Sequence, residues 1–162
     1  MVNYEQDILN MGRCFALLNR RSQLFITEAC SHLGLSYSEY VILIRLYDNE
    51  GCSQEELAAM LSLDKAVVTR TVHMLEKKDM VTREADEKDR RVKRLHLTEK
   101  AKKNKNYLQG LIIEWADYLG ADVSKEQVDI IRWGFQKAAE KATAADIKKM
   151  AAEARRREGI DK

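Results

Sequence analysis

The sequence contains no proline and only seven glycines in 162 residues. Proline ends helices and glycine opens tight turns, so this chain has little to interrupt helical structure. Apolar residues make up 45% of the chain and charged residues 33%, a balance typical of a folded protein and not of a disordered one. We therefore expect a mainly α fold in one functional unit.

The first part of the chain predicts one long helix over residues 4–33. Apolar residues recur at alternating spacings of three and four from Ile8 to His32, and additional leucines widen this stripe. A stripe of this width predicts burial against more than one surface, including a second copy of the chain. Gly34 is expected to end the helix as its C-cap glycine.

Two capping boxes and one capping aspartate mark the next three helix starts. Ser36 with Glu39, and Ser53 with Glu56, each place a glutamate three residues after a serine, which is the pattern that caps a helix N-terminus. Asp64 is expected to cap a third helix that runs to about residue 78. The second and third of these helices are short and separated by a tight turn, which predicts a helix-turn-helix.

After this motif the sequence becomes β-compatible. Residues 80–98 contain two short strand-like stretches around a charged, turn-prone tip at 86–91. Leu95 and Leu97 lie two apart on the return strand, so both are expected to face the core. The sequence thus predicts a winged helix-turn-helix lobe over residues 36–98 with a two-stranded β-hairpin wing, and the fold class becomes mainly α (α+β).

The remainder of the chain predicts helices again. An apolar stripe from Leu108 to Leu119 indicates one helix, and Ser124 with Gln127 supplies a capping box for a last long one. We expect the helices over 4–33 and 101–155 to form a dimer interface, within a single subunit over residues 1–162. The apolar content then falls, and the basic tail around residues 154–157 is expected to fray.

One face of the helix after Asp64 has the chemistry of a DNA-recognition helix. Its outward positions carry Ala66, Arg70, His73 and Lys77, flanked by Val67 and Thr69. Arginine can donate two hydrogen bonds to guanine, threonine can contact bases or phosphates, and small apolar side chains can pack on a thymine methyl. The alternative is a solvated helix face that carries a few cations.

The net charge is only +2, so a DNA-binding hypothesis depends on where the charges lie. Residues 62–97 hold ten Lys or Arg against seven acids, and Lys88, Arg90 and Arg91 cluster at the hairpin tip. A long side chain there could enter a minor groove. We expect Asp89 to form an ion pair with one of these arginines, whereas the alternative is a salt-bridged turn in solvent.

The run LAAMLSLDKAVVTRTVHMLEKKDMVTREADEKDRRVKRLHLTEKA closely resembles the MarR family of bacterial regulators, and the helix order resembles a whole MarR subunit. The most specific likeness is Asp89-Arg90-Arg91 followed by Leu95-His96-Leu97-Thr98, which fits the family's D-x-R…L-x-L-T pattern. The resemblance implies recognition contacts by Thr69 and Arg70, a wing contact by Arg91, and Asp89 as the partner of Arg91. The predicted DNA-binding set is Ser53, Gln54, Lys65, Ala66, Val67, Thr69, Arg70, His73, Lys77, Lys88, Arg90 and Arg91.

The resemblance also implies how such a protein works. It implies a homodimer that binds double-stranded DNA at an inverted-repeat operator, acts as a repressor, and is released by a small lipophilic or phenolic effector. Tyr37, Tyr40 and Tyr47 are the candidate effector residues, with filling of the core as the alternative role. Two positions depart from the family pattern, because Asp79 and Ala101 stand where glycine is usual.

Cys14 resembles the reactive cysteine of the peroxide-sensing branch of the family, and Tyr37 one of the tyrosines that activate it. A redox-sensing regulator is therefore one alternative, although a cysteine on an apolar helix is commonly a small buried hydrophobe. Cys30 and His32 do not predict a zinc site, because residues two apart on a helix point about 200° apart.

No catalytic arrangement or glycine-rich phosphate loop occurs, so we expect no enzyme, no metal and no cofactor. The other alternative is a winged-helix module that binds proteins and not DNA. The polar N-terminus and the odd count of three cysteines favour a cytoplasmic protein with reduced thiols and no membrane partner.

Overall fold

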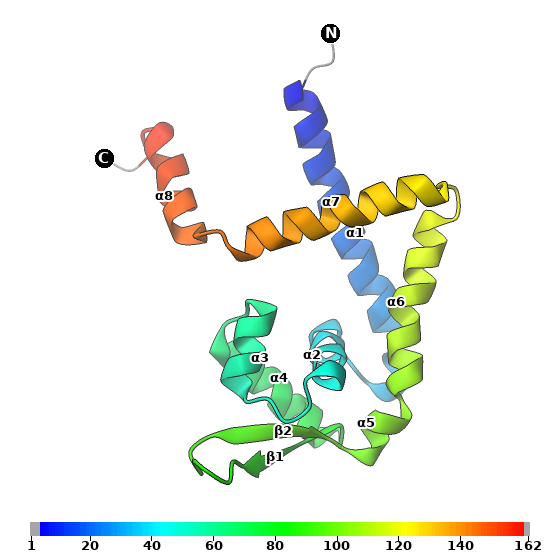
Figure 1. Cartoon of the computed structure of the whole chain (residues 1–162), viewed down its shortest axis with the longest axis vertical. Coiled ribbons are helices and arrows are strands. Elements are labelled where there is room, and N and C mark those ends of the chain that lie inside the picture. Colours follow the sequence, from blue (N-terminus) through cyan, green and yellow to red (C-terminus); the bar gives the residue numbers. More distant parts are fainter. Residues whose placement is uncertain (1–3, 161–162) are drawn as a thin grey trace. The chain divides into compact units, whose positions relative to one another are not determined.

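The structure is a computed structural model that describes residues 4–160, so the predicted span of 1–162 extends beyond the described residues at both ends. Within this range the elements are α1 (Tyr4–Ala29), the 3₁₀ helix η1 (Ser31–Leu33), α2 (Tyr37–Asp48), α3 (Gln54–Leu61), α4 (Lys65–Lys77), β1 (Val81–Ala85), β2 (Lys93–Leu97), α5 (Glu99–Lys103), α6 (Lys105–Gly120), α7 (Lys125–Thr143) and α8 (Ile147–Arg157) (Figure 1). The chain forms two compact units, which divide between Tyr118 and Leu119.

The first helix is shorter than the sequence predicts. α1 ends at Ala29 instead of residue 33, and after the fully buried Cys30 the chain tightens into the single turn of η1. Gly34 follows with φ +65°, and its N–H donates to the Ser31 carbonyl. The predicted C-cap glycine therefore ends the 3₁₀ turn and not the long helix.

The predicted helix starts of the lobe are confirmed. Ser36 and Ser53 each accept a hydrogen bond from the backbone N–H of the glutamate three residues on, and each glutamate accepts one from the backbone of its serine. Asp64 caps α4 by accepting from the N–H of Ala66 at 2.7 Å. These caps satisfy backbone donors that the first turn of a helix leaves unpaired.

The core of the lobe lies between α2, α4 and the hairpin, which pack together in Figure 1. Its apolar side chains come from every element of the lobe and from α1 and α6. The largest fully buried ones are Ile26, Ile42, Leu43, Leu46, Leu57, Val68, Val72, Leu75, Met80, Val81, Leu95 and Leu108. Burial of each such side chain contributes roughly 1.5–3 kcal/mol, so this cluster supplies the main driving force for folding the lobe.

The predicted wing is an antiparallel hairpin in which Val81 pairs with Leu97 and Ala85 with Lys93. Leu95 and Leu97 are buried, as their spacing predicts. The turn before α3 adds to the free edge of β2, because Gly51 N–H donates to the Leu95 carbonyl at 2.8 Å and Leu95 N–H donates to the Cys52 carbonyl at 2.9 Å. The wing is thereby fixed to the helix-turn-helix by backbone hydrogen bonds.

Two non-glycine residues of the lobe have a left-handed backbone. Ser62 (φ 52°) ends α3, and Asp79 (φ 56°) follows α4 at the position where the family pattern has glycine. The helix is thus followed by the left-handed conformation that glycine adopts most easily, even though the residue is aspartate. A side chain in this conformation costs about 1 kcal/mol, which the surrounding contacts must offset.

One buried ion pair connects α4 to the start of α2. Lys78 Nζ lies 2.6 Å and 2.7 Å from the two oxygens of Glu39, and it also donates to the Gly34 carbonyl. Only 4% of the Glu39 side chain is exposed. Burial alone would raise the pKa of this carboxyl, but hydrogen bonds from Lys78 and Ser36 outweigh burial and lower the pKa.

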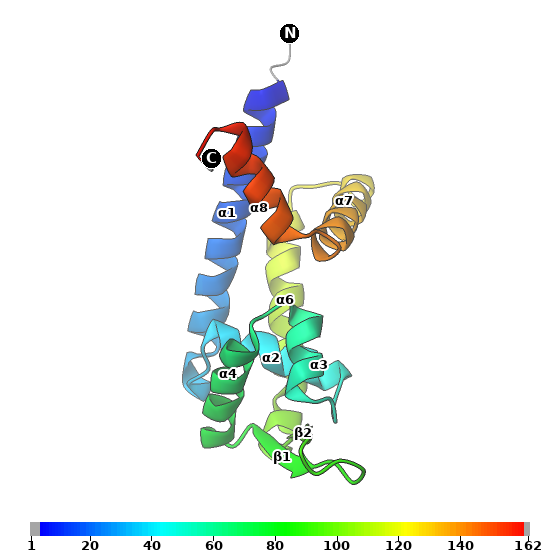
Figure 2. The ribbon, with the colours of Figure 1, turned by 90° about the vertical axis from the view of Figure 1, so that its left-hand side faces the viewer.

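α1 and α6 lie side by side in both views of the first unit (Figures 1 and 2). The Trp115 ring stacks on Phe25 with 5.1 Å between centroids, and its Nε1–H donates to Ser22 Oγ at 2.8 Å. Nevertheless α1 exposes a row of large apolar side chains: Ile8, Leu9, Met11, Phe15, Leu17 and Leu24.

The second unit contains two helices, α7 and α8, in which no described residue is completely buried. α7 begins at the predicted capping box of Ser124 and Gln127, and it exposes Val128, Ile130, Ile131, Trp133 and Phe135. The basic tail is helical instead of frayed, because Asp146 caps α8 by accepting from the Lys149 N–H at 2.9 Å.

Candidate nucleic-acid interface

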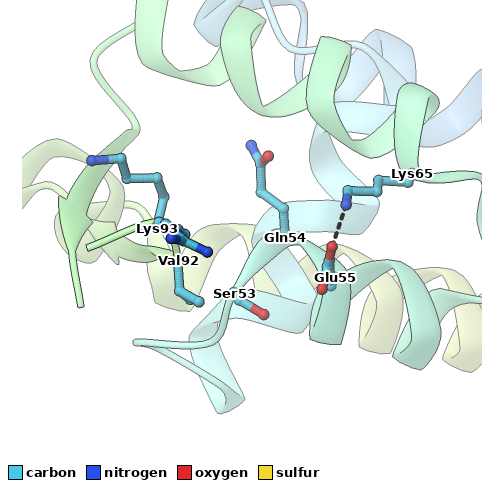
Figure 3. Close-up of a pocket in the computed structure, with 7 residues that line it drawn as sticks. Ser53, Gln54, Glu55, Lys65, Val92 and Lys93 are labelled. Atoms are coloured by element: carbon cyan, nitrogen blue, oxygen red, sulfur yellow. Dashed lines mark hydrogen bonds and ion pairs between the residues drawn. The ribbon is translucent and has the colours of Figure 1, made fainter. Parts of the chain in front are cut away.

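The wing and the two helices of the helix-turn-helix enclose a shared hollow of about 300 Å³ (Figure 3). Its lining residues come from the start of α3, the start of α4 and the return arm of the wing. They are Ser53, Gln54, Glu55, Lys65, Arg91, Val92 and Lys93. Four members of the predicted DNA-binding set, Ser53, Gln54, Lys65 and Arg91, therefore lie around one cavity.

In the part of the chain that the structure describes, some polar groups of this hollow have hydrogen-bond or ion-pair partners and others have none. Figure 3 shows the Gln54 side chain between Lys93 and Lys65, and Lys65 forms an ion pair with Glu55. Gln54 Nε2 is buried and has no hydrogen-bond partner within the described residues. A buried donor without a partner is unfavourable, so a polar acceptor that entered the hollow would be stabilised there.

A second, more open hollow of about 670 Å³ follows the outward face of α4. It is lined by Asp64, Lys65, Ala66, Thr69 and Arg70. The two hollows share Lys65, so the start of the candidate recognition helix joins them. Four predicted contact residues, from Lys65 to Arg70, thus lie along one continuous surface.

The outward face of α4 is exposed where the helical spacing predicts it. Ala66, Thr69, Arg70, His73 and Lys77 are exposed, whereas Val67 is half-buried. Thr69 Oγ1 donates to the Lys65 carbonyl at 2.8 Å, so toward a ligand this residue offers its methyl group and its oxygen lone pairs.

His73, on the same face, lies near an acid of its own helix. Its Nδ1 is 3.7 Å from Glu76 Oε2, while 59% of the His73 side chain is exposed. Glu76 in turn contacts Arg83 of the wing at 3.0 Å. The recognition face therefore adjoins the wing at its far end as well as at its start.

The tip of the wing is organised differently from the prediction. The expected ion pair between Asp89 and Arg91 is wrong, because Asp89 Oδ1 accepts from the backbone N–H of Arg91 at 3.0 Å and not from its guanidinium. A carboxylate two residues before a donor closes a local turn more readily than a long side chain folds back. The ion pair of the wing joins Asp86 and Arg94 at 2.7 Å instead.

Lys88, Arg90 and Arg91 are all exposed at this tip, as predicted. Of these, Arg91 is among the lining residues of the first hollow, while Lys88 lines a separate hollow on the wing. Sequence reasoning missed two cations of the region, Lys93 at the first hollow and Arg94 on β2 close to the wing tip. Lys93 shares the first hollow with Ser53 and Gln54, and Arg94 contacts Glu56 of α3; these residues lie about forty positions earlier and gave no local signal.

The predicted effector residues separate into two groups. Tyr37 and Tyr40 line a hollow of about 360 Å³ together with Val41, Ile44, Arg45, Asp48, Leu61 and Ile112. Tyr47 does not line it, because this ring packs in the core and its hydroxyl donates to the Ala101 carbonyl at 2.7 Å. Burial raises the pKa of Tyr40 and Tyr47 to about 12, so both phenols stay neutral donors.

The three cysteines lie in different environments. Cys14 is exposed on α1, whereas Cys30 and Cys52 are buried, and burial raises the pKa of both buried thiols. Within residues 4–160, no cluster of three His, Cys, Asp or Glu side chains has a geometry that would hold a metal ion. Over the same range, every helix is too short or too polar to cross a membrane.

A helix-turn-helix with an exposed cationic second helix, followed by a two-stranded hairpin that reaches the same surface, defines the winged helix-turn-helix class of DNA-binding proteins. The MarR family model matches residues 35–93 of this chain. HTH-type transcriptional regulator BilQ of Clostridium symbiosum is 31% identical over 104 residues, covering 64% of this chain and 72% of BilQ. An uncharacterised HTH-type regulator of Bacillus subtilis, YybA, is 37% identical over 71 residues, and the match spans only 47% of YybA.

Solved structures agree with these sequence matches. A MarR transcriptional regulator from Methanosarcina mazei is 30% identical and superposes with a TM-score of 0.78, covering 82% of this chain and 95% of that one. A cysteine-to-serine mutant of MarR from E. coli has the same fold at 20% identity, with a TM-score of 0.72 over 82% of this chain and 95% of the other. The chain belongs to the MarR family, and it is a DNA-binding transcriptional regulator and not an enzyme.

Proposed function

We propose that this chain is a sequence-specific repressor that binds an inverted-repeat operator as a homodimer. The observation that carries the proposal is the hollow in Figure 3, which is lined by residues of α3, α4 and the wing. Ser53, Gln54, Lys65 and the wing arginine Arg91 are all among its lining residues. Wing and helix thus offer donors to one polyanionic surface. The E. coli MarR mutant of the same fold was crystallised with operator DNA, which supports this choice of ligand.

The proposal divides the work between two arginines. Arg70 is exposed on α4, where a bidentate contact to guanine would discriminate between bases. Arg70→Ala is therefore expected to weaken binding to cognate DNA more than binding to scrambled DNA. Arg91→Ala is expected to weaken both and to reduce the slope of log affinity against log salt by roughly one per lost phosphate contact. In the dimer, half-site centres about 10 base pairs apart place both subunits on one face of the duplex.

Gel shifts with cognate and scrambled duplexes at several salt concentrations test this assignment. The cognate duplex is first selected from random sequence with the wild-type protein. Wild-type affinity of both variants for the selected site would reject this surface, and the protein-binding winged-helix alternative would then replace it.

We infer the homodimer from the apolar faces that each unit leaves exposed. α1 exposes six large apolar side chains and α7 exposes five, a density more typical of an interface than of a monomer surface. Sedimentation equilibrium is expected to give about twice the chain mass of 18.7 kDa. Ile131→Asp should shift the chain toward monomer, whereas Lys137→Asp on the same helix should not. A monomeric wild type at micromolar concentration that still binds operator DNA would contradict the dimer.

We infer that the hollow beside Tyr37 and Tyr40 receives a small lipophilic or phenolic effector. Val41 and Ile44 supply apolar wall, while Arg45 and Asp48 supply charges near the same hollow. Val41→Trp would fill part of this space. The variant is expected to bind DNA normally yet to keep it in the presence of a phenolic carboxylate that releases the wild type. Equal release from both proteins would place the effector elsewhere.

The exposure of Cys14 favours a second candidate function, regulation by oxidation of this thiol. In that case Cys14→Ser should bind DNA normally but fail to release it when peroxide is added. The buried thiols Cys30 and Cys52 are the matched controls. An unchanged peroxide response in Cys14→Ser would remove this candidate.

A further inference from the structure

Arg94, on β2 close to the wing tip, contacts three separate parts of the lobe. Its Nε–H donates to Asp86 Oδ2 at 2.7 Å across the hairpin, and its Nη1–H donates to Glu56 Oε2 at 2.9 Å on α3. The same Nη1 lies 3.4 Å from the Gly51 carbonyl in the turn before α3. One guanidinium therefore joins both sides of the wing to the first helix of the helix-turn-helix.

The Arg94 partner on the hairpin also shapes the wing tip. Asp86 Oδ1 accepts from the backbone N–H of Lys88 at 2.8 Å and of Asp89 at 3.0 Å. Hydrogen bonds from Arg94 and from these two amides lower the pKa of Asp86 to about 2, so it is ionised at neutral pH. The Asp86 carboxylate thus binds Arg94 through Oδ2 and the backbone of the wing tip through Oδ1.

Glu56 is likewise engaged on two sides. It accepts from the Ser53 N–H at 2.7 Å as part of the capping box of α3 while it accepts from Arg94. Ser53 caps that helix and Gln54 is its first residue, and both line the hollow that Arg91 also lines. The chain of contacts therefore runs from the start of α3 through Arg94 and Asp86 to the tip.

We propose that Arg94 is a positioning residue for DNA binding, which holds the wing tip so that Arg91 and the starts of α3 and α4 meet the same stretch of backbone. The proposal rests on the function proposed above. Arg94 itself need not touch DNA, because its donors are directed at Asp86, Glu56 and Gly51.

The chemistry of arginine suits this position. Its planar fork carries several donors in fixed directions, so it can bind two carboxylates and a carbonyl at once, which a lysine ammonium on a flexible stem does less well. Isolated exposed ion pairs contribute little stability, and Arg94 is 33% exposed. The main effect of this cluster is therefore to order the wing before DNA arrives, which lowers the cost of ordering it on binding.

A double-mutant cycle with Arg91 distinguishes positioning from a general loss of structure. Affinity for the selected duplex is measured for the wild type, Arg94→Gln, Arg91→Ala and the double variant, and Arg70→Ala is introduced into both backgrounds. We expect Arg94→Gln alone to weaken binding roughly five- to tenfold. We also expect Arg91→Ala to cost about tenfold in the wild type but less than about twofold after Arg94→Gln, because the tip is then no longer held.

Arg70→Ala is the control. It should weaken binding by the same factor in the wild type and in Arg94→Gln, since α4 does not depend on the wing ion pair. Lys103→Gln removes an exposed cation of α5 and controls for loss of charge alone, and it should not change the Arg91 factor. If Arg91→Ala costs the same factor with and without Arg94, the inference is overturned. If neither Arg91→Ala nor Arg70→Ala weakens binding, the proposed function fails and this inference fails with it.

Glu56→Gln provides a second cycle in case Arg94→Gln does not fold. Glutamine also serves as the third residue of a capping box, so the variant keeps the start of α3 and loses only the charge that faces Arg94. Glu56→Gln should also reduce the loss of affinity that Arg91→Ala causes, although by less than Arg94→Gln does. An unchanged Arg91 factor in a folded Glu56→Gln protein would contradict the proposed connection through α3.

Discussion

The winged lobe and the second unit differ in how they use apolar side chains. The fully buried side chains lie between Ile26 and Leu111, whereas α7 and α8 contain no buried residue among those described. The first unit, which contains the lobe together with α1 and most of α6, therefore encloses its own core, but the later helices present apolar faces that stay exposed. This difference indicates that the lobe is stabilised by a buried core, whereas the second unit needs another surface to cover its apolar side chains. We propose that a second subunit provides that surface.

The strongest test of this comparison exchanges one apolar residue for alanine in each region. Leu43→Ala in the core is expected to lower the free energy of unfolding by about 3–5 kcal/mol, because the cavity remains lined by rigid neighbours. Ile131→Ala on α7 should lower it by less than about 1.5 kcal/mol at high protein concentration, and by an amount that depends on concentration. Denaturant unfolding at several protein concentrations measures both. Equal, concentration-independent losses would break the comparison.

A smaller effect is expected from the buried ion pair of the lobe. Glu39→Gln leaves the Lys78 ammonium without its carboxylate, and the partial exposure of Lys78 lets it regain some hydration. The variant should therefore be less stable by about 2–3 kcal/mol. The surface variant Glu140→Gln, which loses an exposed pair with Lys137, should change stability by less than about 0.5 kcal/mol. Similar losses in the two variants would show that burial does not matter here.

The same pair makes a defined contribution to acid stability. Because the pKa of Glu39 is lower in the folded chain, its contribution is complete above the unfolded value of about 4.3 and is lost as pH falls through the folded value. The difference in unfolding free energy between the wild type and Glu39→Gln should therefore shrink as pH falls below about 4. Denaturant titrations from pH 7 to pH 3 measure it, and a difference that stayed constant would contradict the lowered pKa.

The smallest expected effect concerns the left-handed residue after α4. Asp79→Gly removes the steric cost of φ 56° but gives the unfolded chain more freedom, so the net gain should be about 0.5 kcal/mol. The Thr98 hydroxyl donates to the backbone carbonyl of Asp79, a contact that glycine retains. Thermal unfolding of Asp79→Gly beside Asp79→Ala measures the effect. A gain for alanine equal to that for glycine would remove the conformational explanation.

The features that the sequence predicted well depend on neighbours close along the chain. The capping boxes at Ser36 and Ser53, the cap at Asp64, and the alternation of Leu95 with Leu97 each follow from spacings of two or three residues. The helix and hairpin patterns also predicted the fold class, family resemblance added the family, and the comparisons confirmed both. The predicted contact residues, the dimer and the effector remain proposals.

The features that were missed depend on distant partners. Arg94 contacts Glu56 across 38 positions, and Lys78 contacts Glu39 across 39, so no local pattern announces either pair. The predicted Asp89–Arg91 ion pair failed for a related reason, because proximity in sequence does not tell a backbone donor from a side-chain donor. Tyr47 takes the alternative, core-filling role, which the sequence could not separate from a cavity-lining role because both have the same spacing.

The backbone hydrogen bonds between Gly51 and Leu95, and between Cys52 and Leu95, have a consequence for the order of folding. A hairpin of adjacent strands closes a short loop, but this third segment must meet β2 across more than forty residues that include α3 and α4. Closing so long a loop costs more chain entropy than closing the hairpin, and long-range pairing slows folding. The helix-turn-helix should therefore be formed, at least in part, before the wing can dock against it. During synthesis, the recognition helix should thus form before the wing is in place.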